Sequence, residues 1–171
     1  MKYEIVDNFL DSYYYKQYYN HFILNKNFPF YLTQDVSTTG ANDGIMFYHK
    51  FISKNIWNVT QNKKEEILSL LEPICNKLNI NKLLRLQVNL YPKSNFFRVN
   101  HKFHIDFNYK HKGCIYYLNT NNGETIIKNS PFNIRVKSVK NRALLFDPSN
   151  LHKSTTCTDA NFRANIIFNY L

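Results

Sequence analysis

Residues 84–90 read Leu84-Arg85-Leu86-Gln87-Val88-Asn89-Leu90, with apolar and polar side chains in strict alternation. Successive side chains of a β-strand point to opposite faces of a sheet, so this period of two predicts a strand with one buried face. The stretch also marks a change along the chain, because helical patterns dominate before residue 82 and strand-like runs follow it. We therefore expect the second half of the chain to decide the fold.

Seven more runs with the length and apolar content of strands follow this one. Eight short strands with few helical interruptions predict an antiparallel sandwich or jelly-roll barrel. Turn-forming residues separate several of the runs. The runs cover residues 96–107, 113–119, 124–128, 134–137, 143–146, 152–157 and 163–170, and turns are expected at 92–95, 121–123 and 147–150.

The N-terminal part begins with a short strand-like stretch, Tyr3 to Val6, followed by a helical pattern. Asp11-Ser12 is a helix N-cap signal, because a short polar side chain there can accept a hydrogen bond from a free backbone N–H. The aromatic-rich run 13–24 then has an amphipathic spacing that predicts a helix. A polar loop is expected over 33–44.

A second helix is expected over 60–78, where apolar residues recur at helical spacing. Pro73 lies inside this pattern and predicts a kink or a break into two pieces, because proline lacks the N–H that a helix interior uses. We expect residues 1–82 to form a helical support region and residues 83–171 a β-rich core, together making one domain.

The composition excludes several classes of protein. A hydrophobic content of 44% in 171 residues is too high for a disordered chain and sufficient for one core. No apolar stretch approaches the ~18 residues of a membrane span, and the start lacks the apolar segment of a secretory signal. The three cysteines are odd in number and widely spaced, which favours a reducing compartment over a disulfide framework. We therefore expect a soluble, cytoplasmic protein with no membrane partner.

The formal charge of +10 results from 22 Lys+Arg against 12 Asp+Glu. Such a charge is typical of proteins that bind nucleic acid. However, Lys, Asn, Ile, Tyr and Phe have codons rich in A and T, so an AT-rich genome would produce the same bias without a partner. The compositional interpretation is favoured, because no run of Lys and Arg exceeds two residues.

The strongest chemical signal is His104-Ile105-Asp106. On a strand, residues two apart project from one face, so the imidazole and the carboxylate can converge on one point. A mononuclear iron(II) site of the two-His, one-carboxylate type needs one more histidine from elsewhere, and His152 is the candidate. Arg163 opens the following apolar strand and can bind a carboxylate through a two-pronged contact. His101 and His111 are also near, and we expect them at the surface or on the substrate side.

These motifs occur in the order found in a known family. From Leu86 to Leu171 the sequence resembles the double-stranded β-helix core of the iron(II)- and 2-oxoglutarate-dependent oxygenases, in particular their prolyl-hydroxylase branch. The N-terminal pattern also resembles small oxygenases of marine bacteriophages. The resemblance is carried by Leu90-Tyr91-Pro92 before His104-Ile105-Asp106, by Cys114-Ile115-Tyr116-Tyr117-Leu118-Asn119, by Asn122-Gly123-Glu124-Thr125, by Leu144-Leu145-Phe146, by His152 and Arg163, and by Phe28-Pro29-Phe30-Tyr31 near the start.

The resemblance implies a fold, a set of cofactors and a set of roles. The fold is mostly β, with N-terminal helices and a cupin-like jelly roll. Fe(II), 2-oxoglutarate and O2 are the implied cofactor and cosubstrates, and hydroxylation or demethylation is implied because related halogenating enzymes lack the ligand carboxylate. The implied iron ligands are His104, Asp106 and His152. The distal carboxylate of 2-oxoglutarate would be bound by Arg163, Tyr117 and Tyr91, with Arg135 and Arg142 as the next arginines to consider.

The expected function is hydroxylation of a protein side chain such as proline, with release of succinate and CO2, in the cytoplasm, which for a bacteriophage protein is that of the infected host. Two alternatives stay open. The first is an oxygenase that acts on nucleic acid, as the charge suggests, and its affinity would fall steeply with salt. The second is a non-catalytic basic module that binds single-stranded nucleic acid through Tyr13 to Tyr19 and Phe96-Phe97-Arg98, and it would not depend on a metal.

Overall fold

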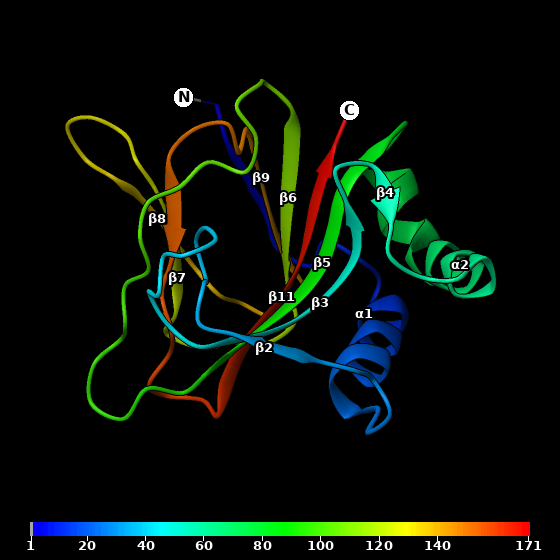
Figure 1. Cartoon of the computed structure of the whole chain (residues 1–171), viewed down its shortest axis with the longest axis horizontal. Coiled ribbons are helices and arrows are strands. Elements are labelled where there is room, and N and C mark those ends of the chain that lie inside the picture. Colours follow the sequence, from blue (N-terminus) through cyan, green and yellow to red (C-terminus); the bar gives the residue numbers. More distant parts are fainter. Residues whose placement is uncertain (1) are drawn as a thin grey trace.

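The computed structural model describes residues 2–171 and contains two antiparallel sheets with helices on one side (Figure 1). In chain order the elements are β1 (Glu4–Val6), α1 (Ser12–Tyr19), the π-helical turn η1 (Asn20–Leu24), β2 (Tyr31–Thr33), β3 (Met46–Ser53), β4 (Ile56–Trp57), α2 (Gln61–Lys77), β5 (Leu83–Pro92), β6 (Lys112–Tyr117), β7 (Glu124–Ile127), β8 (Ile134–Lys137), β9 (Arg142–Phe146), β10 (His152–Ser154) and β11 (Phe162–Tyr170).

The large sheet has eight strands in the order β1-β9-β6-β11-β5-β3-β2, with β4 paired to β3. The small sheet has the order β10-β7-β8. The last strand, β11, therefore lies at the centre of the large sheet, between β6 and β5. In Figure 1 the small sheet lies on one side of the large sheet, and α1 and α2 lie on the other. The predicted mostly-β fold with two antiparallel sheets and helices in the N-terminal half is confirmed.

The alternation in residues 84–90 produces the strand β5, but its polar face does not point to solvent. Leu86 and Val88 are fully buried in the core between the sheet and the helices. Gln87 and Asn89, on the opposite face, are only 2% and 1% exposed. They lie inside the roll, between the large sheet and the small one. The period of two is therefore correct, and the expectation that only one face is buried is wrong.

The same division holds for β11, where Ile166 and Phe168 pack toward the helices while Arg163, Asn165 and Asn169 alternate on the inner face. The apolar outer face packs against the helices through Tyr18 of α1, Phe22 of η1, and Ile67, Leu71 and Ile74 of α2. Burying each such side chain contributes about 1.5–3 kcal/mol. The helices thus stabilise the sheet from outside and leave the inner face free to be polar.

The N-terminal part differs from the expected helical support region. It contributes β1 to the large sheet beside β9, and β3 beside β5. Aromatic residues occupy both faces of β3, so its sequence lacks the clean alternation by which β5 is found. The large sheet therefore includes strands from before residue 82 as well as from after it.

The two predicted helices form. Asp11 caps α1 by accepting a hydrogen bond from the Tyr13 N–H at 2.8 Å. The second helix, α2, runs unbroken through Pro73, so the predicted break is wrong. Proline deprives the carbonyl four residues earlier of its partner. That carbonyl belongs to Ser69, an exposed residue, where water can replace the lost hydrogen bond.

Two predicted strands change. Residues 96–107 form no named strand and pair with the rest of the protein only through isolated bridges, Asn100 with Thr155 and His104 with His152. The run expected at 152–157 is a strand only over His152–Ser154. Among residues 2–171, no helix is long and apolar enough to cross a membrane.

Asn141 connects the N-terminal segment to the large sheet. Its side-chain carbonyl accepts hydrogen bonds from the Leu10 N–H at 3.0 Å and the Tyr116 hydroxyl at 2.7 Å, and its amide donates to the Leu10 carbonyl at 2.8 Å. Its φ of 59° is in the left-handed region, which Asn and Gly tolerate best. This one buried side chain therefore satisfies three polar groups, and the Asn141 backbone adopts the left-handed conformation that the turn requires.

We predict that Asn141→Ala lowers the free energy of unfolding by about 3 kcal/mol, because each buried polar group left unpaired costs about 1–3 kcal/mol. Asn141→Gly should lose about 1 kcal/mol less, since glycine adopts a positive φ without strain. Urea unfolding followed by circular dichroism measures both. Asn95→Ala, at an exposed position, is the control and should change stability by less than about 0.5 kcal/mol. A loss below about 1 kcal/mol in Asn141→Ala would contradict this role.

Candidate metal centre

His104, Asp106 and His152 meet at one point inside the roll. Their ligand atoms all lie within 4.8 Å of one another, and they are the one such group of His, Cys, Asp and Glu found in residues 2–171. The Nε2 atoms of His104 and His152 lie 3.7 Å and 3.9 Å from the Asp106 Oδ1. These separations suit three donors that face a single ion, and the predicted cluster is present.

The reason for the convergence differs from the one expected. His104 and Asp106 do not lie on a regular strand. Instead, the backbones of His104 and His152 exchange two hydrogen bonds of 2.9 Å each, and the Asp106 N–H donates to the Pro148 carbonyl at 3.0 Å. Backbone pairing across 48 residues of sequence, rather than strand periodicity, therefore brings the three side chains together.

Backbone carbonyls orient both imidazoles. The Nδ1 of His104 lies 3.3 Å from the Lys102 carbonyl, and the Nδ1 of His152 lies 2.9 Å from the Asn150 carbonyl. An Nδ1–H that donates to a carbonyl leaves the Nε2 lone pair free for a metal. Burial, followed by the proximity of His152, lowers the pKa of His104 to about 4, so this ring is neutral near pH 7. In both rings Nε2 is the atom that lies near the Asp106 carboxylate.

Two side chains that sequence reasoning missed hold the Asp106 carboxylate. The Arg85 guanidinium donates to Oδ1 at 2.9 Å, and the Asn169 amide donates to Oδ2 at 2.8 Å. Burial would raise the pKa of Asp106, but the Arg85 charge, the two histidines and the Asn169 hydrogen bond outweigh it and hold the value at about 2. Arg85 and Asn169 are cross-strand neighbours on β5 and β11. Their place on the polar face of these strands is the signal that could have found them.

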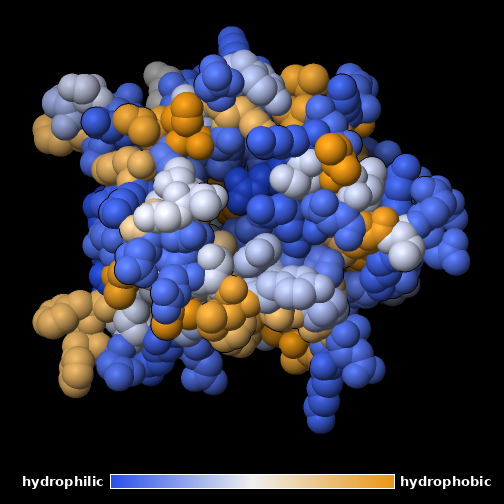
Figure 2. All heavy atoms as spheres, viewed as in Figure 1, coloured by the Kyte–Doolittle hydropathy of each residue, from blue (hydrophilic) through white to orange (hydrophobic). Residues whose placement is uncertain are grey.

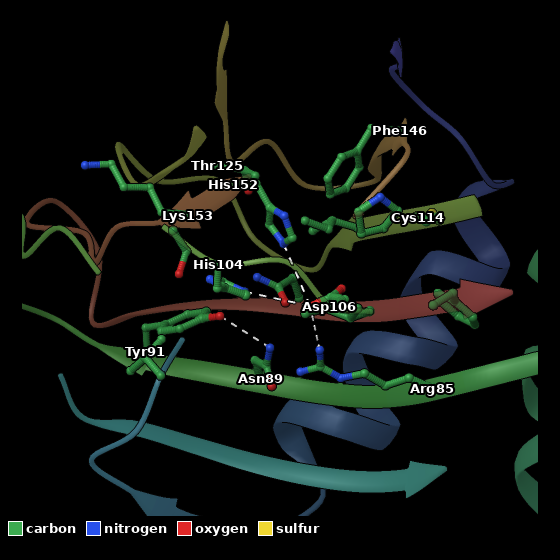
Figure 3. Close-up of a pocket in the computed structure, with 18 of the residues that line it drawn as sticks. Arg85, Asn89, Tyr91, His104, Asp106, Cys114, Thr125, Phe146, His152 and Lys153 are labelled. Atoms are coloured by element: carbon green, nitrogen blue, oxygen red, sulfur yellow. Dashed lines mark hydrogen bonds and ion pairs between the residues drawn. The ribbon is translucent and has the colours of Figure 1, made fainter. Parts of the chain in front are cut away.

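One cavity joins this cluster to the inner face of the large sheet (Figure 3). Arg85, Asn89 and Tyr91 project from β5 toward the cavity, and dashed lines join Asp106 to Arg85 and Tyr91 to Asn89. Arg163 and Asn165 of β11 also line it, as do the three candidate metal ligands. A single ligand can therefore contact both the cluster and the β11 side chains.

Arg163 is fully buried and has no acidic partner within 4 Å in the described part of the chain. Its guanidinium donates to Ser138 Oγ at 2.7 Å, Thr125 Oγ1 at 2.9 Å and the Thr155 carbonyl at 3.3 Å. A Cβ at Gly123 would lie 2.5 Å from the Arg163 side chain, so glycine is needed for this close approach. The positive charge thus has neutral partners only, and an anion would compensate it.

The other two arginines considered are paired elsewhere. Arg135 donates to Glu124 at 2.9 Å, and Arg142 donates to Asp7 at 2.6 Å. Neither lines the cavity. Among the three, only Arg163 has both the position and the free charge to bind an anion beside the cluster.

The two predicted tyrosines differ in position. Tyr91 lines the cavity, and its ring centroid is 5.1 Å from the Arg163 guanidinium. Its hydroxyl accepts a hydrogen bond from the Asn89 amide at 3.3 Å, which leaves the hydroxyl proton free to donate. Tyr117 is fully buried behind Thr125, to which its hydroxyl donates at 2.8 Å, and it does not line the cavity. Thr125, which the sequence did not single out, faces the cavity instead.

His101 and His111 are buried, with 2% and 5% exposure, so their expected place at the surface is wrong. His101 lies beside Tyr91 with ring centroids 5.4 Å apart, and its Nδ1 contacts Ser154 Oγ at 2.7 Å. The Nε2 of His111 accepts a hydrogen bond from the Asn169 amide at 2.8 Å. Both histidines support residues of the site, and neither belongs to the cluster.

No protein-family model and no curated protein matches this sequence. Solved structures do resemble it. An oxidoreductase of the 2OG-Fe(II) oxygenase family from Burkholderia pseudomallei has a TM-score of 0.72 at 10% identity, and the match covers 98% of this chain and 84% of that one. A prolyl hydroxylase from Trichoplax adhaerens, in complex with a peptide fragment of the hypoxia inducible factor oxygen degradation domain, has a TM-score of 0.65 at 18% identity, with coverages of 99% and 83%.

The epimerase SnoN from nogalamycin biosynthesis, in complex with Fe3+, alpha ketoglutarate and nogalamycin RO, has a TM-score of 0.59 at 11% identity, with coverages of 99% and 78%. None of these three structures supports the resemblance to bacteriophage oxygenases. At such identities the likeness concerns the fold. The chain therefore has the 2OG-Fe(II) oxygenase fold, and within it His104, Asp106 and His152 form a cluster suited to a metal ion.

Proposed function

We propose that this protein is an iron(II)- and 2-oxoglutarate-dependent dioxygenase that hydroxylates a substrate, with a protein side chain such as proline as the favoured target. One observation carries the proposal. A single cavity is lined both by the His104, Asp106 and His152 cluster and by Arg163, a buried guanidinium with no acidic partner among residues 2–171. Iron(II) suits the cluster, and a small molecule bound to it can reach Arg163 with a carboxylate through the shared cavity.

The residues present suit the iron ion. Two imidazoles and one carboxylate on the same side form the two-His, one-carboxylate set of non-heme iron(II) oxygenases, which leaves coordination positions open. When bound with 2-oxoglutarate and oxygen, such an ion supplies the oxidation that replaces a C–H hydrogen with hydroxyl and releases succinate and CO2. The protein's part is to hold the three donors, and Arg85 and Asn169 keep the Asp106 carboxylate ionised and oriented.

The residues also suit the cosubstrate. A buried charge without a partner is costly, so the cavity around Arg163 favours a bound anion. Tyr91 has a free hydroxyl proton beside the guanidinium, and Thr125 lines the same wall. These groups would orient the far carboxylate and exclude water from it.

The structural likeness to a prolyl hydroxylase with a bound peptide supports a protein substrate. The likeness to an epimerase that binds nogalamycin RO indicates that the same fold accommodates other substrates, so the substrate does not follow from the fold. The charge of +10 supports nucleic acid as the alternative substrate. Affinity that falls steeply with salt would distinguish that alternative from a protein target.

The non-catalytic module is less well supported. Of the aromatic residues that suggested it, Tyr18 is fully buried, and Tyr15 and Tyr19 pack against the core. Phe96 and Phe97, in the run expected to form a strand, are 85% and 86% exposed. Tyr13 and Tyr14 are exposed as well. Two pairs of exposed rings are a small stacking surface, whereas the cavity brings together three candidate metal ligands and a buried arginine.

The decisive experiment loads the protein with iron(II) and 2-oxoglutarate without oxygen, and then supplies oxygen together with fractions of a cell lysate. A fraction that stimulates succinate release should also contain a component that gains the mass of one oxygen atom. Metal dependence of the release separates this function from passive binding. Absence of any iron-dependent succinate formation would contradict the proposal.

We predict that His104→Ala, Asp106→Ala and His152→Ala each weaken iron(II) binding by more than about 100-fold and abolish turnover. Changes to residues that only support metal ligands typically cost about 10–100-fold, and loss of one of three ligands should cost more. Anaerobic calorimetry measures the binding. His21→Ala, which removes a histidine outside the cluster, should bind iron normally. Full activity in Asp106→Ala would be incompatible with the metal assignment.

We predict that Arg163→Ala lowers the affinity for 2-oxoglutarate by about 100-fold or more. Removing one side of a buried charged pair costs about 3–5 kcal/mol, and about 1.4 kcal/mol corresponds to tenfold. Arg163→Lys should recover part of the loss, because lysine keeps the charge but not the planar two-pronged contact. The weak visible absorbance of the iron–cosubstrate complex, titrated without oxygen, reports the affinity. Arg142→Ala is the control, and unchanged affinity in Arg163→Ala would place the carboxylate elsewhere.

A further inference from the structure

A second hollow lies beside the candidate metal ligands. It is walled by β3 and the turn after it, by residues 33–39, and by residues 105–107. Val36, Arg85 and Asp106 line both this hollow and the cavity of the metal cluster, so the two spaces adjoin. Figure 2 shows hydrophilic residues around a depression on the face where Figure 1 places β3. A substrate bound here would lie next to the candidate metal ligand Asp106.

The hollow carries positive charge that the protein does not compensate. Lys50 and Lys54 line it, and neither forms an ion pair with an acidic residue of the described chain. With Arg85 the lining has three positive charges, and Asp35 and Asp106 supply two negative ones, so one positive charge is left over. Asp35 accepts hydrogen bonds from the Gly40 and Asn42 N–H groups, each at 2.9 Å, while Asp106 is held by Arg85 and Asn169. A bound anionic group would neutralise the remaining positive charge of the hollow.

Secondary structure fixes where the two lysines lie. Lys50 alternates with Met46 and Tyr48 on the face of β3 that lines the hollow, and its ammonium lies 5.5 Å from the Tyr48 ring centroid. Lys54 occupies the two-residue turn between β3 and β4, where it and Asn55 have φ values of 49° and 67°. Burial and the nearby Arg85 charge lower the pKa of Lys50, a cost to its charged form that a bound anion would relieve.

We propose that this hollow binds an acidic side chain of a protein substrate, whose carboxylate pairs with Lys50 and Lys54 while the neighbouring residue enters the metal cavity. The proposal rests on the proposed function and names its substrate class, a protein segment with Asp or Glu near the residue that is oxidised. Hydroxyls of Thr33, Thr38 and Thr39 line the same hollow and can donate to the carboxylate.

A carboxylate fits better than the phosphates of a nucleic acid. Phosphate sites typically add clustered backbone N–H groups or a free arginine to any lysines that they use. Here the loop N–H groups of Val36 and Ser37 donate to Asp43, at 3.0 Å and 3.3 Å, and those of Gly40 and Asn42 donate to Asp35. The Arg85 guanidinium is bound to Asp106. Two lysine point charges remain, which suit single carboxylates.

The test measures fluorescence anisotropy with three labelled probes. The first is a short peptide with one central proline and glutamates on both sides, the second has glutamines in their place, and the third is a short oligothymidylate. Binding is measured to protein loaded with iron(II) and 2-oxoglutarate without oxygen, and again to metal-free protein. We expect the glutamate peptide to bind at least about tenfold more tightly than the glutamine peptide, and this preference to shrink as salt is added.

Charge reversal identifies the site. Lys50→Glu and Lys54→Glu together should remove the preference for the glutamate peptide, and Lys54→Glu alone, at an exposed turn, should reduce it without disturbing the fold. Lys26→Glu makes the same charge change at an exposed residue outside the hollow and should alter the affinity by less than about twofold. Thermal unfolding checks that each variant is folded.

Two results would overturn the proposal. One is equal affinity for the glutamate and glutamine peptides. The other is tighter binding of the oligothymidylate that is weakened by the same lysine variants, which would make the hollow a nucleic-acid site. Failure of the proposed function is recognised separately, by the absence of iron binding and succinate release, because the peptide preference is also read on the metal-free protein.

Discussion

The hydrogen-bonded ion pair between Arg85 and Asp106 is the contact on which the arrangement of the site depends. Asp106 is buried, and its carboxylate is shared between Arg85 on β5 and Asn169 on β11. These two strands are neighbours in the sheet, so the carboxylate is held by the sheet itself rather than by its own irregular segment. Because the Arg85 charge keeps Asp106 ionised, the Asp106 carboxylate is available as a ligand for a metal ion in the cavity.

The two faces of the large sheet have different roles. The outer face packs against the helices, and the inner face carries residues of the candidate site. The outer face of β5 and β11 is apolar and is covered by α1, η1 and α2. This packing allows the inner face to carry Arg163, Asn165 and Asn169, which no apolar core would accept without partners. The helices therefore contribute to the site although none of their side chains lines its cavity.

Three cations around the site have no ion-pair partner in the part of the chain that the structure describes. Arg163 faces the cavity with neutral partners only, and Lys50 and Lys54 line the adjoining hollow, whose acidic residues Asp35 and Asp106 form no ion pair with them. Under the two proposals, Arg163 binds the cosubstrate carboxylate inside the roll, and Lys50 and Lys54 bind a carboxylate of the substrate in the adjoining hollow. Asp106, one of the three candidate metal ligands, lines both spaces, so two molecules bound in them would meet beside the cluster, as chemistry between two bound molecules requires.

Much of this protein follows from local sequence patterns. The period of two in 84–90, the cap at Asp11 and the apolar run 163–170 predict elements that form, because each depends on residues close together in the chain. The order of His104, Asp106, His152 and Arg163 likewise predicts a cluster beside a buried arginine. Tertiary structure alone decided that β3 joins the sheet, that 96–107 is irregular, that the polar face of β5 is buried, and that Arg85 and Asn169 hold Asp106. Those outcomes depend on which distant segments meet, and a periodicity specifies the face on which a side chain lies but not what covers that face.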